Sequence, residues 1–91
     1  TAVAGDNLLI DTQAAQVTIT LPASPTIGDE VSFMDVSPSG GFATNKVTIN
    51  RNSQPIRGAA SNLELVANNQ SIKLRYTNAT KGWQYVYNVT S

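Results

Sequence analysis

Alternation of apolar and polar residues with a period of two runs through most of the chain and constrains its fold more than any other feature. The clearest examples are the segments 17–21 (VTITL), 47–50 (VTIN) and 71–77 (SIKLRYT). A period of two places apolar side chains on one face of a β-strand, whereas a helix needs a period of 3.6. No window of the sequence shows a convincing helical period, so the chain is predicted to be all-β.

Turn-forming residues separate these segments and set the number of strands. Pro22 and Pro25 end one strand and the segment 37–41 (SPSGG) ends another, because proline lacks a ladder donor and glycine opens positive φ. The pair at 68–69 (NN) is predicted to form a tight hairpin, and residues 78–82 a five-residue one. These boundaries predict a small antiparallel sandwich or barrel in a single domain of residues 1–91, with about seven short strands near residues 8–11, 17–21, 30–36, 46–50, 63–67, 71–77 and 83–89.

Two of these strands carry large apolar side chains on patterns that predict deep burial. The segment 30–36 (EVSFMDV) is apolar on both faces, which predicts a strand covered on both sides. In the segment 83–89 (WQYVYNV) the odd positions put large apolar side chains on one face and leave Gln84 and Asn88 outside. The residues predicted to form the core or a subunit interface are Val31, Phe33, Met34, Val36, Ile72, Leu74, Tyr76, Trp83, Tyr85 and Tyr87.

The composition removes most of the chemistry that enzymes use at neutral pH. The chain has no Cys and no His, so it holds no disulfide, no thiolate metal site and no imidazole base. Six Lys and Arg balance six Asp and Glu, which argues against the positive field that nucleic-acid binding needs. Apolar runs such as 8–10 (LLI) are far shorter than the ~20 residues of a spanning helix. We therefore expect no catalytic residue, no metal or cofactor, no nucleic-acid partner and no membrane partner.

The small size and the charge distribution bear on assembly with other copies. For 91 residues without cross-links, the free energy of apolar burial and the entropic cost of ordering nearly cancel, so burial against other copies is the remaining source of stability. Residues 1–45 carry five acids and no base, whereas residues 46–91 carry six bases and one acid. Two interpretations stay open: the halves pair within one folded chain, or an acidic surface of one copy meets a basic surface of the next.

Candidate sites for chemistry are few, and each has a simpler structural explanation. Asp29 and Asp35 could act as a carboxylate pair, but six positions along a strand separate them by roughly 20 Å. Asp6 and Asp11 lack the spacing of a calcium-binding loop. The glycine pair at 40–41 does not match the spacing of a phosphate-binding loop and is predicted to be a turn.

Two further candidates are binding surfaces. Trp83, Tyr85 and Tyr87 could present an aromatic platform to sugars, but on one face of a strand such residues are more often core. Lys73 and Arg75 could form a small basic stripe for single-stranded nucleic acid, but two outward cations are usually just solvated. Recognition of a carbohydrate or receptor through the aromatic residues and loop Asn and Asp side chains stays open as an alternative function.

The order of short elements along the chain is also informative. The first half reads AVAGDNLLIDT at 2–12, VTITLP at 17–22 and IGDEV at 27–31. The second half reads FATNKVTI at 42–49, IRG at 56–58 and KGW at 81–83. Over residues 2–87 this order resembles short β modules in the tail fibres and surface proteins of bacteriophage particles. The resemblance carries no catalytic residues.

The resemblance implies a non-enzymatic structural protein at the virion surface, typically a homotrimer. Two roles stay open: a capsid decoration (cement) protein that clamps neighbouring capsomers, or a module of a tail fibre. The lack of a coiled-coil or stalk segment slightly favours the decoration protein. The implied partners are copies of the chain itself and other virion proteins, such as the major capsid or fibre proteins, together with a host-surface glycan in the binding alternative.

Overall fold

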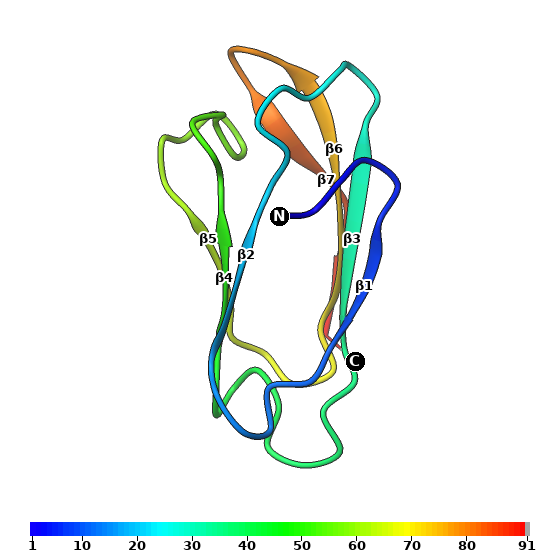
Figure 1. Cartoon of the computed structure of the whole chain (residues 1–91), viewed down its shortest axis with the longest axis vertical. Helices are drawn as coiled ribbons and strands as arrows, with labels where there is room; N and C mark the ends of the chain where they lie inside the picture. Colours follow the sequence, from blue (N-terminus) through cyan, green and yellow to red (C-terminus); the bar gives the residue numbers. More distant parts are fainter. Residues whose placement is uncertain (91) are drawn as a thin grey trace.

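The computed structural model of the protein describes residues 1–90, which form two β-sheets packed face to face (Figure 1). The described residues form no helix, and hence none able to cross a membrane. The all-β prediction is confirmed, and the strands lie within two residues of their predicted positions. The strands in residues 1–90 are β1 (Asn7–Ile10), β2 (Val17–Thr20), β3 (Glu30–Asp35), β4 (Val47–Asn50), β5 (Leu63–Leu65), β6 (Ser71–Asn78) and β7 (Gly82–Val89).

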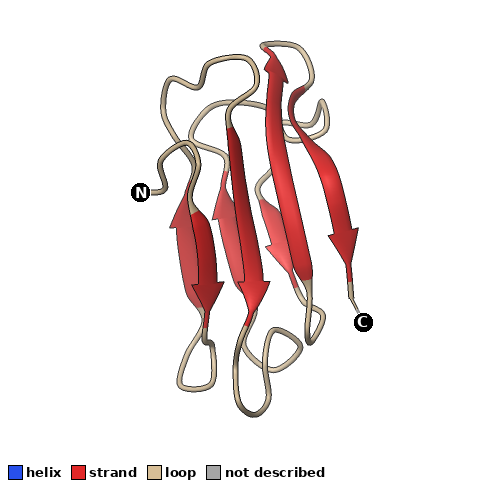
Figure 2. Cartoon of the chain, turned by 90° about the vertical axis from the view of Figure 1, so that its right-hand side faces the viewer, coloured by secondary structure: helices blue, strands red, loops and turns tan. Residues whose placement is uncertain are grey.

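The two sheets are mixed rather than purely antiparallel. One has four strands in the order β1-β3-β6-β7, and the other has three in the order β2-β4-β5 (Figure 2). β1 runs parallel to β3, and β2 runs parallel to β4, while the remaining neighbours are antiparallel. The prediction of an antiparallel sandwich is wrong in this respect. The chain crosses to the other sheet after β1, after β2 and after β3, and it reverses direction at each crossing. β3 therefore runs in the direction of β1, and β4 runs in the direction of β2.

One of the two predicted hairpins is present. β6 and β7 are joined by a turn in which Asn78 pairs with Gly82, as predicted. The hairpin predicted at Asn68 and Asn69 is wrong, because β5 pairs with β4 whereas β6 pairs with β3. Asn69 does adopt the left-handed conformation of a turn, with φ of 60°. That turn connects two sheets instead of two paired strands.

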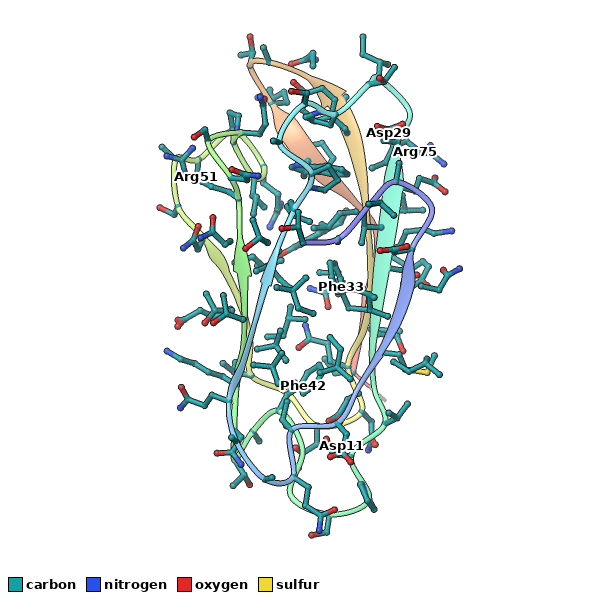
Figure 3. All side chains as sticks on the ribbon, in the orientation of Figure 1. Asp11, Asp29, Phe33, Phe42, Arg51 and Arg75 are labelled. Atoms are coloured by element: carbon teal, nitrogen blue, oxygen red, sulfur yellow. The ribbon has the colours of Figure 1, made fainter. Side chains whose placement is uncertain are left out.

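The core fills the space between the sheets. Phe33 and Phe42 both point into it, although they come from a strand and from a loop (Figure 3). Each large apolar side chain that is fully buried stabilises the fold by about 1.5–3 kcal/mol, so this layer dominates stability. The buried apolar residues are Ala2, Ile10, Leu21, Val31, Phe33, Phe42, Val47, Ile49, Ile56, Leu65, Ile72, Leu74, Tyr76 and Trp83.

The residues predicted for the core or an interface divide between the core and the surface. Those in the core are Val31, Phe33, Ile72, Leu74, Tyr76 and Trp83. Tyr85 is half-buried and packs against them. Met34, Val36 and Tyr87 are not core residues of this chain, because 43%, 43% and 41% of each is exposed. A subunit interface at these three positions stays a prediction.

The strand predicted to be covered on both sides is covered on one. β3 does lie inside its sheet, between β1 and β6. Its inward side chains, Val31 and Phe33, are buried, but Met34 on the opposite face is exposed. The apolar residues on both parities of this segment therefore mark an uncovered face in the single chain.

A β-bulge in β7 explains why Tyr85 and Tyr87 lie on opposite faces of the sheet. Tyr85 pairs with Leu74 and Tyr87 pairs with Lys73, so Val86 is the extra residue between them. Side chains paired across an antiparallel ladder point to the same face. Tyr85 therefore shares the inner face with Leu74, and Tyr87 shares the outer face with Lys73. The prediction that the odd positions of 83–89 share one face fails at this bulge.

Candidate functional site

The outer face of the four-stranded sheet carries exposed apolar side chains in register. Leu9 of β1 pairs with Met34 of β3. Met34 in turn pairs with Ser71 of β6, which pairs with Val89 of β7. Leu9, Met34 and Val89 are 69%, 43% and 51% exposed, and Tyr87 lies in the next row. Leu9, Met34, Tyr87 and Val89 are named the outer patch.

The polar side chains on the same face bind one another. Arg75 Nε donates a hydrogen bond to Glu30 Oε2 at 2.7 Å, and Lys73 Nζ lies 3.3 Å from Glu30 Oε1. The hydrogen bond from Arg75 lowers the pKa of Glu30 and outweighs the raising effect of desolvation. Asn7, Ser32 and Lys73 lie in one row across the sheet, and the Ser32 hydroxyl donates a hydrogen bond to Asn7 Oδ1. Covering the outer patch would therefore leave no isolated carboxylate beside it.

The charges of the two halves of the chain are used in different ways. Glu30, from the acidic half, pairs with Lys73 and Arg75 from the basic half, so the halves pair partly within one chain. Lys46 pairs with Glu64 inside the basic half. The remaining four acids accept hydrogen bonds from backbone amides of turns. These acids are Asp6, Asp11, Asp29 and Asp35.

Asp35 holds together the loops at one end of the sandwich. Its Oδ1 accepts a hydrogen bond from the amide of Ser37 at 2.9 Å, and its Oδ2 accepts two more, from Phe42 and Asn69, each at 3.1 Å. Burial raises the pKa of Asp35, but the hydrogen bonds from Ser37, Phe42 and Asn69 outweigh it and lower the pKa below its ordinary value. The carboxylate is thus held ionised as a structural acceptor.

The structure does not bring the candidate carboxylates together. Asp29 precedes β3 and Asp35 ends it, so the two flank opposite ends of a six-residue strand. Among residues 1–90, no three acidic side chains are grouped so that they could hold a metal ion. At the glycine pair 40–41, a Cβ on Gly41 would lie 2.6 Å from Asp35 Oδ2. This pair therefore serves the close packing of a turn around Asp35.

The fold separates the residues of the candidate aromatic platform, and it pairs the cations of the candidate basic stripe with an acid. Trp83 is fully buried and packs edge-on against Tyr76, with ring centroids 5.5 Å apart. Tyr85 faces inward and Tyr87 outward, so the three residues share no surface. The cations considered as a basic stripe, Lys73 and Arg75, both pair with Glu30.

Two members of the outer patch were not among the residues predicted for an interface. Leu9 lies in the run 8–10 (LLI), which is apolar on both parities. Such a run on a short strand indicates cover on both faces, and this signal could have identified Leu9. Val89 could not have been placed on the outer face from the sequence, because its face depends on the bulge at Val86.

Comparisons with known proteins leave these surfaces as the main guide to function. No model of a known protein family matches the chain, and no curated protein matches it. The functional interpretation therefore depends on the outer patch, on the loops at the two ends of the sandwich, and on the order of short elements along the sequence.

Proposed function

We propose that the protein is a non-enzymatic structural module of a bacteriophage virion surface that assembles as a homotrimer through the outer patch. The observation that carries this proposal is one row across the four-stranded sheet. Leu9, Met34 and Val89 are exposed in it on three strands, and Ser71 of β6 lies between Met34 and Val89. Exposed apolar side chains gathered on one face of a small domain mark an interaction surface, because leaving them in water is unfavourable.

The geometry of the outer face favours other copies of the chain as the occupant. The patch lies on hydrogen-bonded strands that form a broad, stiff surface, and its polar neighbours are already paired through Glu30 and Ser32. Three copies that present the same face around a threefold axis would cover the outer patch and form a closed assembly. Such burial also adds to the stability of a small domain that has no cross-link.

In a trimer of this kind the loops at both ends of each sandwich stay available to other virion proteins. The end that contains Asp11 lies opposite the end that contains Asp29 and Arg75 (Figure 3). A decoration protein would use one end to bridge neighbouring capsid subunits, whereas a fibre module would use both ends to stack along a stalk. Both roles need a rigid body, which the Asp35 hydrogen bonds support at one end.

Molar mass in solution tests the assembly directly. Multi-angle light scattering is expected to give three times the mass of one chain over a wide concentration range. A folded monomer at all concentrations would overturn the homotrimer. Imaging of a virion that carries this chain, with the density located on the head or on a fibre, then separates decoration protein from fibre module.

A further inference from the structure

A groove of about 380 Å³ opens at the edge of the sandwich where β5 of one sheet lies near β7 of the other. Its apolar wall comes from Ile56, Ala59 and Leu63. Polar groups converge on it from the loop between β4 and β5, through Arg57 and the pair 61–62 (SN), and Tyr85 of β7 also lines it. An apolar wall with a few convergent polar groups is the usual make-up of a small-molecule site.

Arg57 is the charged group of this groove, and it is available to a ligand. Its guanidinium carbon lies 4.6 Å from the centroid of the Tyr85 ring, in a cation–π contact. No carboxylate in residues 1–90 pairs with it, and no acid lines the groove. A guanidinium held over an aromatic ring makes no hydrogen bond to that ring, so its N–H donors stay free to match the two oxygens of a carboxylate.

The backbone around Arg57 is fixed before any ligand arrives. The Arg57 amide donates to the Trp83 carbonyl, and the Gly58 amide donates to the Lys81 carbonyl, both at 2.8 Å. Arg57 itself has φ of 52°, a left-handed conformation that costs a long side chain energy. Such strain persists where the surrounding structure imposes it, and it is concentrated at binding sites. Here it holds the guanidinium over Tyr85.

Asn62 provides a second oriented polar group. Its Oδ1 accepts a hydrogen bond from the Arg51 amide at 3.0 Å, which leaves the Nδ2 amide as a free donor. Beside it, Ser61 is exposed and offers a hydroxyl that both donates and accepts. Groups of this type suit sugar hydroxyls, which also donate and accept, while the wall around Leu63 suits the C–H surface of a sugar ring.

We propose that this groove binds an acidic saccharide, with the sugar carboxylate on Arg57 and the ring hydroxyls on Asn62 and Ser61. Tyr85 is a positioning residue that acts by orienting Arg57. This inference is independent of the proposed trimer, because Tyr85 lies on the inner face and the outer patch on the other. It also differs from the candidate aromatic platform of Trp83, Tyr85 and Tyr87, because Trp83 is fully buried.

The test is a titration of the isotope-labelled protein followed by NMR, using 3′-sialyllactose, a galacturonic acid disaccharide and, as the neutral control, lactose. At least one acidic sugar is expected to give saturable shifts at Arg57, Asn62 and Tyr85, with a Kd on the order of 1 mM. Which acidic sugar binds identifies the source of the carboxylate. Lactose is expected to give no saturable shift. Saturation by lactose with the same Kd, or no saturation by either acidic sugar, would overturn the proposal.

Matched variants test whether saccharide binding depends on the groove or only on the net charge of the protein. Arg57→Asn removes the guanidinium but suits the left-handed backbone, so the fold is retained and binding is expected to weaken about tenfold or more. Lys81→Gln removes the same charge nearby without touching the groove and is expected to bind within twofold of the wild type. Tyr85→Phe keeps the ring and is expected to bind normally, whereas Tyr85→Leu is expected to weaken binding as Arg57→Asn does. Equal weakening in Arg57→Asn and Lys81→Gln would reduce the effect to net charge and overturn the assignment.

Discussion

The carboxylate of Asp35 accepts a hydrogen bond from the backbone amide of Asn69 at 3.1 Å, although the two residues are 34 positions apart in the chain. The same oxygen accepts the amide of Phe42, and the other oxygen accepts that of Ser37. One side chain at the end of β3 thereby fixes the connection to β4 and the connection between β5 and β6. These two connections join opposite sheets, so the carboxylate helps to set how the sheets are held together.

Removal of this acceptor is expected to destabilise the protein. Asp35→Ala leaves three turn amides without their partner, and the free energy of unfolding is expected to fall by about 2 kcal/mol. Asp11→Ala is the control, because Asp11 accepts one local amide, that of Gln13, at the surface. Asp11→Ala is expected to lower the free energy of unfolding by roughly 0.5 kcal/mol. Chemical denaturation measures both values. Equal costs for the two variants would contradict the role assigned to Asp35.

The same carboxylate makes stability depend on acid pH. The folded protein lowers the pKa of Asp35, so its stabilising contribution is fully present above the unfolded value of about 3.9 and is lost as the pH falls through the folded pKa. Asp35→Asn cannot ionise and lacks this dependence. The difference in unfolding free energy between wild type and Asp35→Asn is therefore expected to be constant near neutral pH and to shrink below about pH 4. Denaturation curves across that range provide the measurement.

Gly82 and Gly5 share a positive φ but differ in how closely other atoms approach them. Both have positive φ, of 67° and 89°. A Cβ on Gly82 would overlap the backbone carbonyl of Pro55, whereas one on Gly5 would meet no atom within 4 Å. Gly5→Ala is expected to cost about 1–2 kcal/mol from backbone strain alone, and Gly82→Ala is expected to cost more than about 4 kcal/mol or prevent folding. Thermal unfolding compares the two, and similar melting temperatures would rule out the tight contact at Pro55.

Two adjacent residues in β3 are expected to respond to the same substitution in different ways. Phe33→Asp buries an unpaired carboxylate in the core and is expected to unfold the chain. Met34→Asp places the charge on the outer patch and is expected to leave a folded monomer. Ile27→Asp alters an apolar residue that is 73% exposed in the loop between β2 and β3, outside the outer patch, and it is expected to remain trimeric. Circular dichroism and light scattering give fold and mass, and a trimeric Met34→Asp protein would exclude the outer patch as the interface.

Deletion of single residues tests the bulge in β7. Deletion of Val86 removes the unpaired residue and leaves Tyr85 opposite Leu74 and Tyr87 opposite Lys73, so the fold is expected to survive. Deletion of Gln84 instead places Tyr85 opposite Arg75 on the outer face and Val86 opposite Leu74 on the inner face, because the register slips by one residue. That variant is expected to be strongly destabilised. Denaturant midpoints distinguish them, and a greater loss for the Val86 deletion would contradict the register described here.

The local pattern of the sequence predicts a large part of the fold but little of the outer patch. Strands at Val17–Thr20 and Ser71–Asn78 follow directly from alternation, and the Asn78 to Gly82 hairpin follows from turn chemistry. Met34 was predicted to be covered because it lies in a segment with apolar residues at both odd and even positions. Its alignment with Leu9 and Val89 could not be predicted, because register between strands depends on contacts between residues far apart in the chain.

The amino-acid sequence on its own determined that this protein is built from short strands, where most of them begin and end, and which chemistry it lacks through the absence of Cys and His. Tertiary structure alone decided the partner and direction of each strand, the opposite faces of Tyr85 and Tyr87, and the stacking of Arg57 on Tyr85. The physical reason is that alternation is a property of one strand and its solvent, whereas pairing, bulges and grooves arise only when distant segments compete for the same core.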